Sequence, residues 1–341
     1  MPHDGIGAIA APGLCRRSSD RPTPRISVRF LGVCDTFLDR DSGGRTMLDN
    51  GGRAMTSSSL IRPAEGPGRI LHVTPESAGW ANVEFGVVEV TGDAPWSGVQ
   101  AERETAVVPL AGQGRVIVGD GDMAVELSRD SVFTEMARIV YLPPGTPYRI
   151  ESEAGLRASV GSAPAEGRYP VRVLEPSEMR IEIRGGGQAY RQVVHSLAHP
   201  LPAERLILYE VYVPRGTWSG WPPHCHDGRD GSPYLEEVYY FRLDRPEGYA
   251  IHRNWRDDED YDDAMVVTDG DVALVPKGYH TSVACPGSNM YFLNYLAGEL
   301  QDGERRTPPC FMAEHTWIEA DWTAGEWGLP VVTPDGSGVR E

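Results

Sequence analysis

The sequence predicts an all-β protein with two tandem barrels, and three observations support this fold class. The 341 residues include 39 glycines and 28 prolines, a composition that suits many tight turns. Short runs rich in β-branched residues recur along the chain, whereas strong helical periodicity is absent. Residues 138–148 and 271–280 each form a predicted strand that leads into Pro-x-Gly, which indicates a weak internal duplication.

Each half of the chain contains a series of expected strands. A short helix precedes the first series, because Thr74 offers a capping hydroxyl, Pro75 suits the first helical position and the pattern ends at Trp80. Apolar runs bounded by glycine, proline and aspartate then predict the strands. They cover residues 83–90, 105–110, 115–118, 123–127 and 138–142 in the first half, and residues 205–213, 235–241, 249–255, 265–267, 271–275 and 290–295 in the second.

Changes in composition divide the chain into four parts. Residues 1–54 are rich in glycine, serine and arginine and have little periodicity, so we expect a disordered N-terminal extension. We expect the first barrel over residues 55–195 and the second barrel over residues 196–330. Residues 331–341 are expected to be a flexible tail.

The overall charge excludes some classes of partner. With 49 acidic and 32 basic residues the net charge is −17, which repels nucleic acids and anionic membranes. No run of about 18 apolar residues predicts a membrane span. The odd number of cysteines, five, argues against a disulfide framework. We therefore expect a cytoplasmic protein with reduced thiols, no nucleic-acid or membrane partner, and a small-molecule substrate.

A histidine motif gives the clearest functional signal. His224 and His226 are two residues apart on an extended segment, so their side chains face the same side. A strand with Glu236 and Glu237 follows, and a later Pro-x-Gly turn leads to His280. This order is typical of a cupin, the double-stranded β-helix or jelly-roll barrel, so we expect a bicupin. Three imidazoles and one carboxylate suit one divalent metal ion and leave positions for substrate.

Only one of the two glutamates can face the metal, because neighbouring residues of a strand point to opposite sides. Glu237, directly before Val-Tyr-Tyr, is the chosen ligand. The first half has no histidine between His72 and His195, and its Pro-x-Gly turn lacks one as well. We therefore expect the first barrel to hold no metal and to act as a scaffold.

Longer segments around this motif resemble the 5-deoxy-glucuronate isomerase family of myo-inositol catabolism. The resemblance covers about residues 60–320, and its most specific part lies between residues 218 and 241. The matching segments are residues 218–227 (WSGWPPHCHD), 235–241 (LEEVYYF), 269–272 (DGDV), 276–280 (PKGYH), 74–80 (TPESAGW), 184–187 (RGGG) with Arg191, and 290–294 (MYFLN).

The resemblance implies a bicupin that isomerises the aldehyde acid 5-deoxy-glucuronate to 5-dehydro-2-deoxy-gluconate. Carried over residue by residue, it implies a metal site for zinc, manganese, iron, cobalt or nickel with ligands His224, His226, Glu237 and His280. Cys225 and residues 252–255 (HRNW) depart from the family pattern. These departures remove no ligand, but they leave the exact uronic acid open.

The implied reaction needs a base and a cation for the substrate carboxylate. The candidate bases in the chain are Glu236, Tyr239 and His252. The candidate cations are Arg253 and Lys277, which lie nearest to the ligands in the sequence, and Arg184 and Arg191.

Other functions fit the same ligand set, since fold alone does not fix function. They are a pectin-pathway 5-keto-4-deoxyuronate isomerase, a cupin-type non-haem iron dioxygenase, and a sugar-binding bicupin without catalysis. Sheet edges in bicupins also allow a homo-oligomer.

Overall fold

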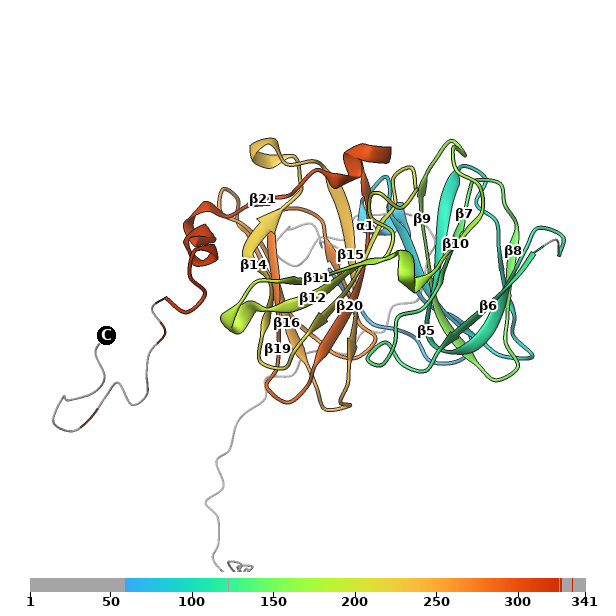
Figure 1. Ribbon diagram of the computed structural model, residues 1–341, viewed down its shortest axis with the longest axis horizontal. Coiled ribbons are helices and arrows are strands. Elements are labelled where there is room, and N and C mark those ends of the chain that lie inside the picture. The colour runs from blue at the N-terminus through green and yellow to red at the C-terminus, as the bar shows by residue number, and fades with distance from the viewer. Residues whose placement is uncertain (1–58, 122, 325, 327–332, 334–341) are drawn as a thin grey trace, which may run out of the picture. The chain divides into compact units, whose positions relative to one another are not determined.

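The computed structural model describes residues 59–121, 123–324, 326 and 333, which form two β-barrels side by side (Figure 1). The predicted all-β bicupin architecture is confirmed. The expectations for residues 1–54 and, apart from Thr333, for residues 331–341 lie outside the described residues. In the described part of the chain, no helix has the length and apolar character needed to cross a lipid bilayer.

The first barrel is a nine-stranded antiparallel sheet that curls on itself. Strands β10, β7, β5, β9, β3 and β2 follow one another in that order, while β6 and β8 pair with β5, and β4 pairs with β8. Valine, leucine and isoleucine side chains fill its interior. The strands are β2 (Gly68–Val73), β3 (Glu84–Val90), β4 (Trp96–Gly98), β5 (Arg103–Val118), β6 (Met123–Arg129), β7 (Ile139–Leu142), β8 (Tyr148–Glu151), β9 (Leu156–Pro164) and β10 (Arg172–Leu174).

The second barrel consists of two sheets that face each other across an apolar core. The seven-stranded sheet contains, in order, β1 (Leu60–Ile61), β18 (Val272–Val275), β15 (Leu235–Leu243), β20 (Met290–Gly298), β13 (Ile207–Val213), β12 (Arg191–His195) and β11 (Arg180–Arg184). The five-stranded sheet contains β17 (Tyr261–Val267), β16 (Ala250–Arg256), β19 (Tyr279–Ala284), β14 (Trp218–Cys225) and β21 (Cys310–Phe311).

Two strands that precede residue 196 belong to the sheet of the second barrel. β11 pairs with β12, and β12 pairs with β13. The segment from Arg180 to His195 therefore forms one wall of the second barrel. This placement brings its polar side chains to the pocket described below.

Short helices connect the strands. The predicted helix is present as α1 (Pro75–Ala78), where Thr74 accepts a hydrogen bond from the backbone N–H of Ser77 at 3.1 Å. The other helices of the described residues are short 3₁₀ helices of three to seven residues: η1 (Pro176–Glu178), η2 (Gly187–Ala189), η3 (Arg229–Gly231), η4 (Asp302–Arg306) and η5 (Ala313–Glu319).

The predicted duplication is visible in the strand pairing. In the first barrel β5 pairs with β7 on one side and with β9 on the other. In the second barrel β15 pairs in the same way with β18 and β20. The outer faces of the two central sheets pack against each other and form one large apolar core, to which Phe85, Tyr240 and Tyr295 contribute.

Candidate metal centre

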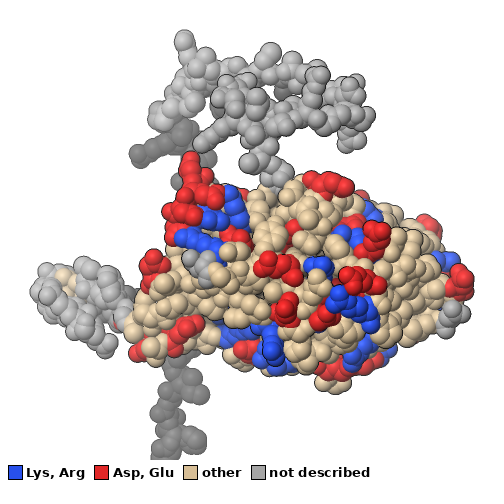
Figure 2. Space-filling model, turned by 90° about the horizontal axis from the view of Figure 1, so that it is seen from above, with Lys and Arg blue, Asp and Glu red and all other residues tan. Residues whose placement is uncertain are grey.

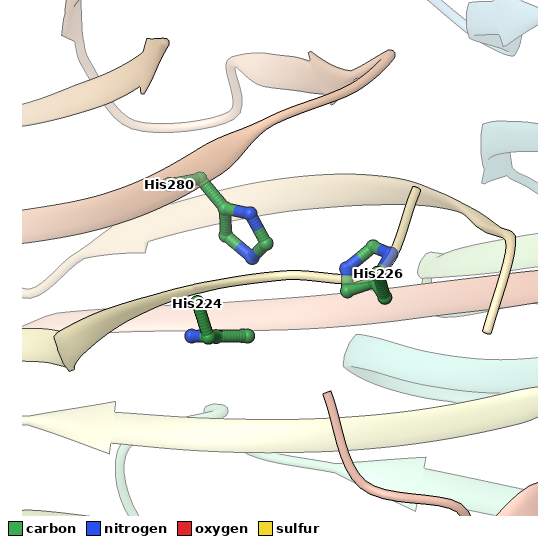
Figure 3. Close-up of side chains that lie close together, drawn as sticks. All are labelled: His224, His226 and His280. Carbon is green, nitrogen blue, oxygen red and sulfur yellow. The ribbon is translucent and has the colours of Figure 1, made fainter. Parts of the chain in front are cut away.

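Three histidine side chains converge inside the second barrel (Figure 3). The pairing of β14 with β19 places His224 opposite His280, and His226 follows directly after the end of β14. One ring nitrogen from each histidine lies within 4.8 Å of the other two. The strand pairing thus brings His280 to the two histidines that precede it in the sequence by more than fifty residues.

A carboxylate completes this cluster from the opposite sheet. Glu237 on β15 has its Oε2 atom 2.8 Å from Nε2 of His226 and 3.3 Å from Nε2 of His280. Its side chain is buried. The neighbouring Glu236 points to the other face of the strand, as expected from alternation.

The donor atoms of the cluster fit a divalent cation. Nδ1 of His226 lies 2.8 Å from the carbonyl oxygen of Leu235, which can only accept, so Nδ1 donates and Nε2 presents its lone pair. That lone pair faces Glu237, another acceptor, and a cation or a proton must lie between them. Nε2 of His280 is also buried and has no hydrogen-bond partner among the described residues. Imidazole nitrogens around a carboxylate match the ligands that zinc and related metals prefer.

The electrostatic environment favours the ligand forms of His224 and Glu237, whereas the contact with Glu237 raises the pKa of His226. Burial lowers the pKa of His224 well below its ordinary value, and the neighbouring His280 and His226 lower it further. Burial alone would raise the pKa of Glu237, but its contacts with His226 and His280 outweigh this effect and lower the pKa. A neutral imidazole and an ionised carboxylate are the forms that bind metal.

Three members of the cluster, His224, His226 and Glu237, line a cavity of about 640 Å³. One wall is the inner face of the seven-stranded sheet, where Tyr239, Asn294, Tyr209 and His195 occupy neighbouring strands in register. The C-terminal segment forms another wall, with Phe311 and Trp322 among its lining residues. The cavity therefore connects the metal ligands to a polar region built by β11, β12 and β13.

The structure brings two of the four candidate cations to this cavity. Arg184 and Arg191 both line it. Arg184 contacts Glu182 at 3.1 Å. The guanidinium of Arg191 donates to the carbonyl oxygen of Ala189 at 3.2 Å, and no described carboxylate pairs with it. Arg191 is thus the candidate cation with capacity left for an anionic ligand.

The other two candidates lie on the outer surface. Arg253 pairs with Asp262 at 2.7 and 2.8 Å, and Lys277 pairs with Glu259. Neighbouring charges of opposite sign are common on the surface of the molecule (Figure 2). Neither side chain is among the residues that line the cavity, so the structure does not support their role in holding the substrate carboxylate.

The three candidate bases have different positions. Tyr239 lines the cavity, with its ring centroid 5.7 Å from that of His280. His252 is buried behind it, 4.8 Å from Tyr239 between ring centroids, and hydrogen-bonds Oγ of Ser282 at 2.9 Å. Glu236 lies outside the cavity, where its carboxylate accepts hydrogen bonds from the backbone N–H groups of residues 81–83 at 2.8 Å.

Sequence reasoning missed several residues of the cavity. His195 lines the cavity and contacts Glu182 at 2.9 Å. Arg180 and Tyr209 also line it. The signal was present in residues 180–195, because alternate residues of the two strands point to one face.

Comparisons with known proteins agree with this architecture. Residues 59–318 match the model of the KduI/IolB family. A 5-deoxy-glucuronate isomerase of Geobacillus kaustophilus is 36% identical over 268 residues, which cover 76% of this chain and 95% of the relative. The corresponding protein of Lacticaseibacillus casei is 31% identical and covers 68% of this chain and 86% of its own.

Solved structures give the same result for the fold. An IolB-like protein from Salmonella typhimurium is 34% identical, with a TM-score of 0.70 over 76% of this chain and 98% of that chain. Oxalate decarboxylase of Lactobacillus farciminis, at 12% identity and a TM-score of 0.54, covers 79% of this chain and 92% of its own and shows the shared bicupin fold alone. The family match and the relatives above 30% identity span both barrels, and this chain belongs to the KduI/IolB family.

Proposed function

We propose that the protein is a metal-dependent aldose–ketose isomerase that converts 5-deoxy-glucuronate to 5-dehydro-2-deoxy-gluconate. The observation that carries the proposal is one cavity lined by two complementary kinds of group. His224, His226 and Glu237 of the cluster line it, and so does Arg191, whose guanidinium has no carboxylate partner among the described residues. Such a site suits a molecule with a carbonyl group and a carboxylate, and the names of the relatives supply its identity.

The cluster would hold one divalent metal ion, with zinc, manganese, iron, cobalt and nickel all compatible with its donors. When bound there, the ion supplies a Lewis acid that polarises a substrate carbonyl. His224, His226 and His280 supply neutral nitrogen ligands, and Glu237 supplies one negative charge. The inner face of the barrel keeps this chemistry away from bulk water, because His226, His280 and Glu237 are all buried.

Arg191 would bind the carboxylate of the substrate. Its guanidinium is planar and can donate two parallel hydrogen bonds to a carboxylate. Its positive charge also contributes to the lowered pKa of His224, which indicates that the two groups act on one another across the cavity. A uronic acid can therefore be held at one end while its reacting end faces the histidines.

Of the three candidate bases, only Tyr239 lines the cavity, where it suits the role of a hydrogen-bond donor to the reacting oxygen and not that of a base. The reaction takes a proton from C2 of the substrate and returns one at C1, and the developing enol oxygen needs a hydrogen-bond donor. Burial and the nearby carboxylate of Glu237 raise the pKa of Tyr239 well above its ordinary value, so its hydroxyl keeps its proton. It would donate to the substrate oxygen, with His252 packed behind its ring.

The test is an NMR assay of 5-deoxy-glucuronate with metal-loaded wild-type protein and the His226→Ala variant. We expect conversion by the wild type and loss of both bound metal and turnover in the variant, because one of four ligands is removed. His72→Ala, a histidine of the first barrel, is the matched control and should retain both. No conversion by fully metal-loaded wild type would contradict the proposed function, and oxygen consumption instead would favour the dioxygenase.

A further inference from the structure

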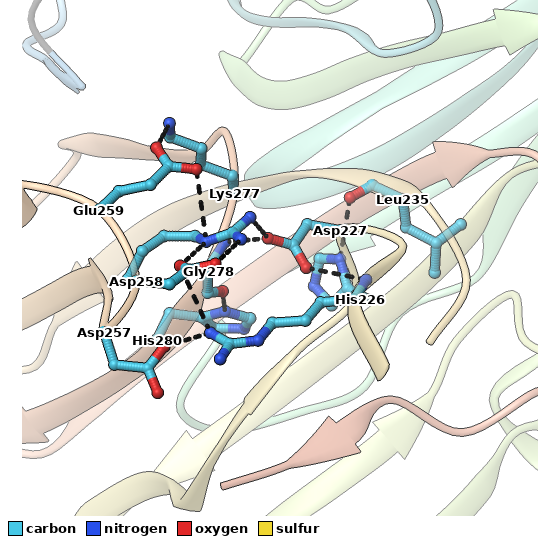
Figure 4. Close-up of polar contacts among 11 residues, drawn as sticks. His226, Asp227, Leu235, Asp257, Asp258, Glu259, Lys277, Gly278 and His280 are labelled. Carbon is cyan, nitrogen blue, oxygen red and sulfur yellow. Dashed lines mark hydrogen bonds and ion pairs between the residues drawn. The ribbon is translucent and has the colours of Figure 1, made fainter. Parts of the chain in front are cut away.

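Asp227 lies directly after the ligand His226 and makes contacts that no part of the proposed chemistry uses. Its side chain is 5% exposed. One carboxylate oxygen, Oδ2, accepts hydrogen bonds from the backbone N–H of Gly278 at 2.8 Å and from Nη1 of Arg256 at 2.9 Å. The other, Oδ1, accepts from the backbone N–H of Arg229 at 3.3 Å. Asp227 is therefore the centre of a small network (Figure 4).

This network joins the two chain segments that carry the histidines. The ladder between β14 and β19 ends with the pair His224 and His280, and His226 lies beyond it. The hydrogen bond from Gly278 to Asp227 continues the connection past the end of the ladder. It ties Asp227, which follows His226, to Gly278, which lies two residues before His280.

The conformation of Gly278 directs its N–H toward Asp227. The residue has φ of +82°, and a Cβ atom there would lie 2.2 Å from the carbonyl oxygen of Trp255. Any other residue would be strained at this positive φ and would place its Cβ atom against Trp255, so only glycine fits here. Nδ1 of His280 lies 3.5 Å from the carbonyl oxygen of the same glycine. The turn thus presents its N–H to Asp227 and its C=O to the ligand histidine.

The acidic loop after β16 supports the network from outside. Asp258 pairs with Arg256 at 2.7 and 2.8 Å, and Asp257 pairs with Arg229. The pair with Asp258 holds the side chain of Arg256 against Asp227. Part of the acidic segment 257–263 is therefore fixed to the second barrel.

We propose that Asp227 is a positioning residue that holds His226 and His280 at the separation a metal ion requires. The inference rests on the metal centre of the proposed function and adds a residue that sets its affinity. Hydrogen bonds to groups that support metal ligands restrict their motion, and their loss typically lowers metal affinity by about 10–100-fold.

The test measures the binding of Co²⁺ to metal-free full-length protein by its visible absorption. Asp227→Asn preserves the shape of the side chain but replaces one acceptor oxygen with a donor. We expect the variant to bind Co²⁺ roughly 10–100-fold more weakly than the wild type, with an altered absorption spectrum. Circular dichroism and thermal unfolding of the metal-free proteins check that the variant is folded.

Asp258→Asn is the matched control. It removes the same charge from the same cluster and also loses a contact with Arg256, but it does not touch Gly278. We expect its Co²⁺ affinity to stay within about twofold of the wild type, since exposed ion pairs contribute little. Equal affinities for wild type and Asp227→Asn would overturn the inference and leave the proposed function intact. Failure of the wild type to bind Co²⁺ would contradict the metal centre itself.

Hydrogen exchange of the wild-type protein gives a test that needs no variant. If Asp227 holds the turn before metal arrives, the amide hydrogen of Gly278 is protected from exchange in the metal-free protein. Rapid exchange of this hydrogen in folded, metal-free protein would overturn the inference.

Discussion

A half-buried cation, Arg191, without a carboxylate partner among the described residues is the most informative single residue of the cavity. Burial and, to a smaller extent, the nearby Arg184 together lower the pKa of Arg191 to about 10. The side chain still carries a full charge at neutral pH. A charge in such a place is costly unless an anion compensates it, and among the described residues no carboxylate does so. A carboxylate of the substrate would meet this need.

We predict that Arg191→Gln lowers kcat/KM about 100-fold, mainly through a higher KM. The loss corresponds to about 2–3 kcal/mol for a charge-assisted contact. Steady-state kinetics with 5-deoxy-glucuronate measure the change. Arg253→Gln is the control, because that arginine pairs with Asp262 on the surface, and it should leave both constants unchanged. An unchanged KM in Arg191→Gln would place the carboxylate elsewhere.

At the residue level, the sequence indicated the cluster better than the rest of the cavity. The two-residue spacing of His224 and His226 and the alternation at Glu237 are local rules, and the structure brings these side chains together. The choice of Arg253 and Lys277 used closeness in the sequence to the ligands. Closeness in the sequence does not tell which face of a strand a side chain occupies. The side chains of Arg253 and Lys277 both lie outside the cavity.

The hairpin of β11 and β12 is the element that completes the cavity. Its turn, Gly185–Gly187, leaves room for the indole of Trp322 from the C-terminal segment. A Cβ atom at Gly186 would lie 2.6 Å from this ring. Because Gly186 has an extended backbone that any residue can adopt, contact with Trp322 is the reason that a side chain is excluded there.

We predict that Gly186→Ala lowers the free energy of unfolding by about 1–3 kcal/mol, as overpacking does in close-packed sites. It should also raise KM, because Trp322 lines the cavity. In the background of Trp322→Ala the same change should cost little, so a double-mutant cycle yields a coupling energy of about 1 kcal/mol or more. Gly92→Ala, where the nearest atom lies 3.9 Å away, is the control. If the two substitutions had additive effects on the free energy of unfolding, Trp322 would not pack against this turn.

At the level of elements, the sequence predicted most strands of the central sheets but missed those with little apolar content. The expected strands 105–110 and 115–118 are parts of one continuous strand, β5, which runs past the intervening glycines. β14 was not predicted, because prolines and glycine interrupt its pattern. β17 begins at Tyr261, inside the acidic segment of residues 257–263, where Asp262 lies opposite Trp255 of β16. Pairing with a neighbour outweighs local propensity in such strands.

The two barrels share one plan but differ at the metal-binding positions. β4 and β8 place Gly98 opposite Tyr148, where β14 and β19 place two histidines opposite each other. Thr105 of β5 has the same strand neighbours as Glu237 of β15. The first barrel therefore offers neither imidazole nor carboxylate at these three positions. The shortage of histidines in the sequence predicted this difference, although the positions themselves follow only from the strand register.

A reciprocal pair of carboxylates joins the barrels. Glu236 of the second barrel accepts backbone hydrogen bonds at 2.8 Å from Ala81, Asn82 and Val83, which lead into β3. In the same way, Glu104 of the first barrel accepts from the backbone N–H groups of residues 204–206, which lead into β13, at 2.6–2.8 Å. Each glutamate thus fixes the entry of a central strand in the other barrel.

This arrangement predicts that Glu236→Gln affects the whole molecule and not the chemistry. The amide would direct hydrogens at backbone N–H donors, so we expect the free energy of unfolding to fall by about 2–4 kcal/mol, which lowers Tm by roughly 5–10 °C. Glu104→Gln should have a similar effect, whereas Glu151→Gln, which weakens a surface pair with Arg115, should cost less than about 1 kcal/mol. Thermal unfolding, Co²⁺ binding and kcat are measured on the same preparations. Together they separate a structural role of Glu236 from a catalytic one. A Glu236→Gln variant with normal stability but no turnover would show that this residue is catalytic. The loss of a carboxylate that only joins the two barrels should lower turnover only through lower stability.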